Sequence, residues 1–170
     1  MSQNLLAGIS LDPKFIFGVN GSIPDCLAIY DVKRLLYVAG HNVVIYNPDE
    51  GNMNFISGTE GALRINAISL SPSNRFLAIC EVGEKTGLCT IVDVGQRKRI
   101  ITLPEKYIKS PEILGAVFSP KNDKRHILTL VGEPEFAVLF WDYEKFVVRQ
   151  RVELKVNIEG IRTDFKNFSF

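Results

Sequence analysis

Few residues in this sequence have the types and spacing that phosphate chemistry requires. The segment Gly83-Glu84-Lys85-Thr86-Gly87 contains the glycine, lysine and threonine of a phosphate-binding loop. Such a loop has the spacing G-x-x-x-x-G-K-[ST] and lies between a strand and a helix. That spacing is missing here and no helical pattern follows, so the segment is predicted to be a polar turn between two strands.

The cysteines and histidines do not form a pattern typical of a metal site or a catalytic site. Cys80 and Cys89 flank the same turn, but there is no CxxC motif and no nearby histidine to complete a zinc site. His41 falls in a tight turn, and His126 begins a strand after a charged loop; neither lies beside a G-x-S-x-G motif. We therefore expect no catalytic residue, no metal ligand and no cofactor, and we expect that the chain is not an enzyme.

The densest basic segment is Gln96-Arg97-Lys98-Arg99, and Lys106 and Lys109 follow it closely. Two interpretations are open. The segment can be a solvated turn into an outer strand, where lysine and arginine discourage pairing with another sheet edge. Alternatively, it can contact an acidic partner, such as the glutamate-rich surface of a microtubule. On the second interpretation, Arg97, Lys98 and Arg99 are the candidate partner-contact residues.

Composition is that of one folded globular domain. The chain has 170 residues, of which 46% are hydrophobic, and its 20 basic and 19 acidic residues leave a net charge of +1. A balance this close to zero argues against a dedicated binder of nucleic acid or of anionic membranes. The longest apolar run, Phe136 to Trp141, is too short to span a bilayer, and the first residues do not resemble a signal peptide. The odd number of cysteines, three, fits reduced thiols in the cytosol.

Short β-branched and aromatic runs, separated by turn residues, predict a chain that is almost entirely β-structure. No stretch keeps apolar residues at helical spacing over three turns. The only segment that approaches such a pattern, residues 98–115, is interrupted by Pro104 and Pro111.

The predicted strands recur as a set. Ser71-Pro72 and Ser119-Pro120 each follow a strand and lie 48 residues apart. Each is followed, 22 or 23 residues after its serine, by an aspartate that ends a later strand, Asp93 or Asp142. A shorter copy precedes them, with a tight hairpin turn at Gly40-His41-Asn42. Four antiparallel strands repeated every forty-odd residues are typical of the blades of a β-propeller.

The segments 66–79, 116–120 and 40–47 resemble WD repeats, a family of β-propellers. The apolar-Ser-Pro-x-Asn step and the pair Trp141-Asp142 carry the resemblance. The chain departs from the family pattern because Trp-Asp occurs in one copy only, and because its Gly40-His41 pair lies in a hairpin turn. Within the family, the chain resembles the long axonemal proteins of cilia and flagella that carry a coiled coil after their WD propellers.

The expected fold is therefore an all-β, WD40-like propeller with about three four-stranded blades and the start of a fourth. The blades are predicted at about 26–58, 65–104 and 113–154. Residues 14–19 are a candidate ring-closing strand, and residues 156–170 are the start of the next blade or a truncated end. Since a small propeller needs at least about four blades to close, we expect the chain to be the N-terminal part of a longer propeller or a truncated product.

The resemblance also implies a function. A WD-repeat protein of this type would be a non-catalytic, protein-binding scaffold in the axoneme of a cilium or flagellum, part of the cytoskeleton, that helps to position inner-arm dynein on doublet microtubules. Its partners would be axonemal dynein, proteins associated with the doublet microtubules and tubulin itself. The alternative left open by the sequence is a WD-repeat adaptor or substrate receptor in a cytosolic multiprotein complex.

Overall fold

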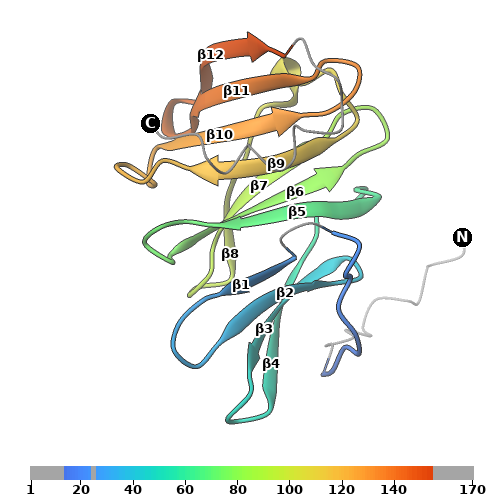
Figure 1. Ribbon diagram of the computed structural model, residues 1–170, viewed down its shortest axis with the longest axis vertical. Helices are drawn as coiled ribbons and strands as arrows, with labels where there is room; N and C mark the ends of the chain where they lie inside the picture. The colour runs from blue at the N-terminus through green and yellow to red at the C-terminus, as the bar shows by residue number, and fades with distance from the viewer. Residues whose placement is uncertain (1–13, 24–25, 155–170) are drawn as a thin grey trace, which may run out of the picture.

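The computed structural model describes residues 14–23 and 26–154 (Figure 1). These residues contain twelve β-strands and two short 3-10 helices, which confirms the all-β prediction. The strands are β1 (Leu27–Ile29), β2 (Leu35–Ala39), β3 (Asn42–Asn47), β4 (Asn52–Ser57), β5 (Arg64–Leu70), β6 (Phe76–Val82), β7 (Leu88–Asp93), β8 (Lys98–Thr102), β9 (Ile113–Phe118), β10 (His126–Val131), β11 (Ala137–Asp142) and β12 (Val147–Glu153). The 3-10 helices are η1 (Glu105–Tyr107) and η2 (Tyr143–Lys145).

The strands form three separate four-stranded sheets in chain order. Blade 1 contains β1 to β4, blade 2 contains β5 to β8 and blade 3 contains β9 to β12. Neighbouring strands in each blade are antiparallel, so each blade is a meander of hairpins. The three sheets are stacked one on another, and the first strands β1, β5 and β9 lie next to one another (Figure 1). The prediction of three four-stranded blades is confirmed.

The segment before blade 1 differs from the expectation. Phe15–Val19 has no regular secondary structure, and none of the sheets formed by the described residues includes it. Ile16 packs against the apolar cluster of blade 1 that contains Tyr37 and Val44, and just after the segment the Asn20 N–H donates to the Val38 carbonyl at 3.0 Å. A ring-closing role for this segment therefore stays a prediction. The predicted start of a fourth blade, 156–170, lies outside the described residues.

An apolar core fills the space between blades 1 and 2. Strand alternation places Leu36 and Val38 of β2 on the face toward blade 2, while Tyr37 and Ala39 belong to a different cluster. On the other side, Leu77 and its neighbours on β6 and β7 point toward blade 1. The buried members from the two sheets are Leu36, Val38, Val43, Ile45 and Ile56 of blade 1, and Ile65, Ile68, Leu77, Ile79 and Val92 of blade 2.

A second core joins blades 2 and 3. Trp141 of β11 is fully buried in it, and its indole meets the ring of Tyr107 edge-on with the ring centroids 5.7 Å apart. The indole Nε1–H donates to the hydroxyl of Thr129 at 2.9 Å. Because the only tryptophan of the chain is both buried and hydrogen-bonded, it fixes the position of β11 against β10. Trp141 therefore packs between blades 2 and 3.

Candidate functional site

The predicted partner-contact residues lie at the β7–β8 turn, on the outer strand of blade 2. Arg97 has left-handed backbone geometry (φ +55°), and its Nη1 donates to Asn54 Oδ1 at 2.8 Å. The Nη2 of Arg99 donates to two backbone carbonyls of blade 1, at Ser57 (3.1 Å) and Gly58 (2.5 Å). Both guanidinium groups therefore bridge blade 2 to the outer strand of blade 1.

Lys98 differs from its two neighbours. It begins β8 opposite Asp93, it is exposed, and its side chain forms no ion pair with another described residue. Of the later lysines, Lys106 is engaged locally, because its ammonium lies 4.9 Å from the centroid of the Tyr107 ring, whereas the hydrogen bond from Lys109 to Glu135 is made by its backbone N–H. Lys98 is therefore the member of the predicted set that is most available to a partner.

A buried carboxylate that the sequence analysis missed also joins blades 1 and 2. Glu81 of β6 is completely buried, and its Oε1 lies 3.1 Å from His41 Nε2. The same oxygen accepts the N–H of Thr59 at 2.7 Å, whereas Oε2 has no hydrogen-bond partner among the described residues. The position of His41 in the β2–β3 turn thus serves an inter-blade contact. The available clue was a single acidic residue within the apolar strand Phe76–Val82.

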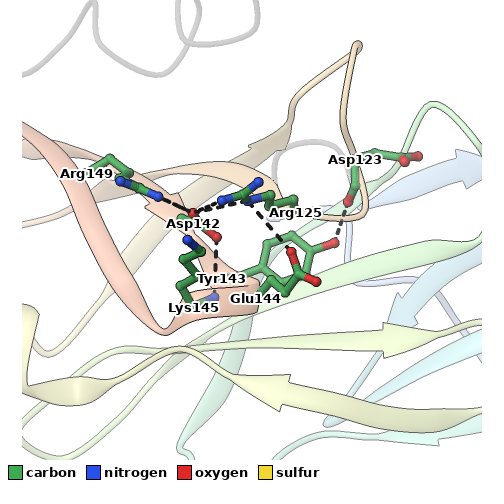
Figure 2. A network of polar contacts seen from close by, with 7 residues as sticks. All are labelled: Asp123, Arg125, Asp142, Tyr143, Glu144, Lys145 and Arg149. Carbon is green, nitrogen blue, oxygen red and sulfur yellow. Dashed lines mark hydrogen bonds and ion pairs between the residues drawn. The ribbon is translucent and has the colours of Figure 1, made fainter.

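A buried aspartate ends the third strand of blade 3, surrounded by arginines (Figure 2). The side chain of Asp142 is fully buried, and its Oδ2 accepts hydrogen bonds from Arg125 (2.9 and 3.1 Å) and Arg149 (2.7 and 3.2 Å). Its Oδ1 accepts the Lys145 N–H at 3.3 Å. The hydrogen bonds from Arg125, followed by those from Arg149, hold the pKa of the Asp142 carboxyl well below its ordinary value.

Blade 2 repeats this arrangement with one arginine fewer. The carboxylate of Asp93 accepts the Gln96 N–H at 2.9 Å and a hydrogen bond from Arg75 Nε at 3.0 Å. The backbone hydrogen bond and then the Arg75 guanidinium lower the pKa of Asp93. The spacing of the repeat predicts both aspartates as strand ends and not as ion-pair residues. Their partners could have been found, because an arginine directly precedes the second strand of every blade, at Arg34, Arg75 and Arg125.

The glycine-containing segment is a turn between two strands, as predicted, and the two thiols that flank it are buried. The N–H groups of Gly83 and Gly87 donate to the carbonyls of Pro111 (2.9 Å) and Ser110 (2.7 Å), in the segment before β9. Cys80 and Cys89 are direct cross-strand partners, both fully buried; no disulfide joins them, and the Cys80 thiol donates a hydrogen bond to the Cys89 sulfur at 3.9 Å. The hydrogen bond to Cys89, together with burial, raises the pKa of the Cys80 thiol well above its ordinary value.

Residues 14–23 and 26–154 contain no cluster of three or more histidine, cysteine, aspartate or glutamate side chains able to hold a metal ion. Within the same part of the chain, no helix has the length and apolar character needed to cross a bilayer. The second histidine, His126, is half-buried and its ring lies against Phe140, with the centroids 5.2 Å apart.

Two curated proteins share detectable sequence similarity with the chain. It is 28% identical over 174 residues to cilia- and flagella-associated protein 57 C of Tetrahymena thermophila, an alignment that covers 97% of the chain and 13% of the relative. It is 26% identical over 133 residues to cilia- and flagella-associated protein 57 of Mus musculus, covering 76% of the chain and 10% of that relative. The chain thus spans only about an eighth to a tenth of the length of these relatives. No protein-family profile matches the chain.

A solved structure shares its fold. A chain of the hydrazine synthase of Kuenenia stuttgartiensis superposes on 87% of the chain with a TM-score of 0.60 and 14% identity, over 40% of its own length. A chain in the crystal structure of a mitotic checkpoint complex covers 89% of this chain, with a TM-score of 0.45 and 14% identity, over 60% of its own length.

Three observations support the same interpretation: the repeated four-stranded blades, the segments similar to WD repeats, and the two curated relatives. Over its described residues the chain is an all-β structure of three four-stranded blades, and its sequence is similar to that of cilia- and flagella-associated protein 57.

Proposed function

We propose that the chain belongs to a non-catalytic scaffold of the ciliary or flagellar axoneme, where it serves as a protein-interaction platform. The observation that carries this proposal is the similarity to cilia- and flagella-associated protein 57 over 97% of the chain in one relative and 76% in the other. Both relatives are named for an association with cilia and flagella. The location that follows is the cytoskeleton of a cilium or flagellum.

The finer part of the proposal concerns the partners. By its resemblance to axonemal WD-repeat proteins, the scaffold would help to position inner-arm dynein on doublet microtubules. It would contact dynein, proteins bound to the doublets, or tubulin. Lys98 supports a contact with an acidic surface, because it is exposed beside two arginines that are already bound to blade 1.

Fractionation of ciliated source cells tests this function. An antiserum against residues 60–155 is used to probe whole cells, cytosol and detergent-stripped axonemes side by side. We expect the signal in the axoneme lane and its release by salt, because contacts between exposed charges weaken as ionic strength rises. A signal confined to the cytosol would contradict the axonemal scaffold and favour an adaptor in a cytosolic complex.

A tagged chain then tests the contact residue. Lys98→Glu is expected to weaken rebinding to salt-extracted axonemes, whereas Lys124→Glu makes the same charge change on an exposed loop of blade 3 and serves as the matched control. Equal effects of the two variants would mean that rebinding depends on net charge and not on Lys98.

A further inference from the structure

The central hairpin of blade 2 holds two thiols face to face. Cys80 of β6 and Cys89 of β7 are direct partners in the antiparallel ladder, and the Cys80 thiol donates a hydrogen bond to the Cys89 sulfur at 3.9 Å. A disulfide needs Cα atoms about 4.4–6.8 Å apart, and opposed residues of an antiparallel pair lie about 4.5–5.5 Å apart. The backbone therefore meets the main geometric requirement for a disulfide between these two residues.

The turn that joins the two strands keeps the thiols in register. Gly83 and Gly87, at its two ends, donate their N–H groups to the carbonyls of Pro111 and Ser110 at 2.9 and 2.7 Å, in the segment that leads into blade 3. A slip of the hairpin by one residue would break these bonds and would also turn one thiol to the opposite face of the sheet. The two sulfurs therefore stay opposed as long as blade 2 is folded.

Burial restricts the reactions that are open to this pair. Both thiols are 0% exposed and belong to the apolar core between blades 2 and 3. Among the described residues, no group of three or more metal-binding side chains includes either of them. A bulky reagent or a second chain cannot reach these sulfurs while the core is closed, whereas hydrogen peroxide is little larger than water and can enter during brief local opening. The reaction partner left for each sulfur is the other sulfur.

The third cysteine lies in a different part of the molecule. Cys26 packs against the core between blades 1 and 2, which is on the opposite side of the blade 2 sheet from the core that contains Cys80 and Cys89. It is also half-buried, so an oxidant in solution reaches it more easily than the other two. Cys26 is therefore not a partner for either buried thiol, and its oxidation can serve as an internal reference.

We propose that Cys80 and Cys89 form an oxidative modification site, at which hydrogen peroxide converts the two thiols into a disulfide that joins β6 to β7 within the folded blade. This inference goes beyond the proposed function and does not depend on it. In a reducing compartment both residues are thiols at rest, and a disulfide formed there is transient, because cellular dithiols reduce it again. The pair would thus record exposure to peroxide in a reversible way.

The two sulfurs take different roles in the reaction. The hydrogen bond to Cys89, together with burial, raises the pKa of the Cys80 thiol, so Cys80 stays protonated and the attack on peroxide falls to Cys89. The Cys89 thiolate attacks one peroxide oxygen, the O–O bond breaks, and the departing hydroxide takes up the thiol proton to leave as water; Cys89 is then a sulfenic acid. The Cys80 sulfur attacks the Cys89 sulfur, the S–S bond forms as the S–O bond breaks, and the Cys80 proton leaves with the hydroxide as a second water. The thiols lose two electrons and two protons, and the peroxide is reduced to two waters.

The test is treatment of the full folded chain, carrying Cys26→Ser, with excess hydrogen peroxide, followed by intact-mass measurement and peptide mapping. We expect the mass to fall by about 2 Da, the peptides that contain Cys80 and Cys89 to be cross-linked, and dithiothreitol to restore the original mass. Two results would overturn the proposal. One is that both thiols stay reduced at a peroxide dose that fully oxidises Cys26 in the original chain. The other is a gain of oxygen atoms at either sulfur that dithiothreitol does not reverse.

Two further arms test whether the disulfide belongs to the folded state. The oxidised chain is examined by circular dichroism and by the fluorescence of Trp141, which lies in the same core, and we expect both spectra to be those of a folded chain. Loss of the folded spectra when the disulfide forms would overturn the proposal. Adding Cys89→Ala to the Cys26→Ser chain leaves Cys80 without a partner, so its mass should not change with peroxide. Because this truncation at a buried position can itself destabilise the chain, the peptide map of the unaltered pair remains the deciding measurement.

Discussion

The buried carboxylate of Glu81 in blade 2 lies 3.1 Å from the ring nitrogen Nε2 of His41 in the β2–β3 turn of blade 1. The same oxygen accepts the N–H of Thr59, in the connection between the two blades. One side chain thus joins a turn of blade 1, the inter-blade connection and an inner strand of blade 2. Because Glu81 has no exposure to water, these hydrogen bonds are its compensation for lost solvation.

The first prediction is that Glu81→Ala strongly destabilises the chain. The substitution leaves the Thr59 N–H without its acceptor and removes the contact with His41, so we expect the free energy of unfolding to fall by about 3 kcal/mol. Urea denaturation followed by circular dichroism measures the loss.

Two controls separate the role of the carboxylate from that of packing. Glu81→Gln keeps the shape and an acceptor oxygen, so we expect it to retain more stability than the alanine variant. His41→Ala removes a partner that is 38% exposed and is expected to cost less than Glu81→Ala. Equal losses for the alanine and glutamine variants of Glu81 would contradict the hydrogen-bonding role.

The second prediction concerns acid stability and Asp142. Its pKa is lowered in the folded chain by Arg125 and then Arg149, so its contribution to stability is complete above about pH 4, the ordinary range of an unfolded carboxyl, and is lost as the pH falls below that value. Asp142→Asn removes this contribution. We expect the urea midpoint of the variant to fall less than that of the original chain between about pH 7 and about pH 3.

Glu144→Gln is the control for this measurement, since Glu144 is largely exposed and only 3.7 Å from Arg125 through one oxygen. Its pH dependence is expected to match that of the unaltered chain. Asp93 also has a lowered pKa, so the Asp142 variant should retain part of the acid sensitivity. Identical pH profiles for Asp142→Asn and the original chain would refute the role of the arginine network.

A third prediction tests the hydrogen bond between Trp141 and Thr129. Thr129→Val keeps the volume of a fully buried side chain but leaves the indole N–H without an acceptor, which we expect to cost about 1–3 kcal/mol. The fluorescence of Trp141, the only tryptophan, reports unfolding directly. Thr102→Val is the comparison: it removes a hydroxyl that is hydrogen-bonded to Thr90 at 3.0 Å, but at an exposed position on β8 where water can replace it, so it should lower the unfolding midpoint less. If both variants cost the same, the bond to Trp141 adds nothing specific.

The blades could be predicted from the sequence because the patterns that specify their strands and turns are local in the chain. Strand alternation, turn residues and the spacing of Ser71 and Ser119 repeat within each blade, so they are readable along the chain. The hydrogen bond from the Arg97 side chain to Asn54 could not be predicted in this way, since it depends on the distance between blade 1 and blade 2.

The fourth prediction is an order of reactivity among the thiols. Cys26 is half-buried, whereas Cys80 and Cys89 are fully buried between blades 2 and 3. Alkylation requires the thiolate, and the raised pKa of Cys80 keeps that thiol protonated in addition to shielding it. We therefore expect iodoacetamide to modify the folded chain once, at Cys26, and to modify all three cysteines after unfolding in urea. Peptide mass spectrometry locates the labels.

The matched variant for this experiment is Cys26→Ser, which should leave the folded chain almost unreactive while the urea-unfolded chain takes up two labels. Labelling of Cys80 and Cys89 then also measures opening of the interface between blades 2 and 3, because their sulfurs become accessible only when that core separates. The Thr129→Val variant weakens the same core, so it should label faster than the original chain. Rapid labelling of Cys80 in the folded, unaltered chain would contradict the burial of this pair and the close packing of blade 2 on blade 3.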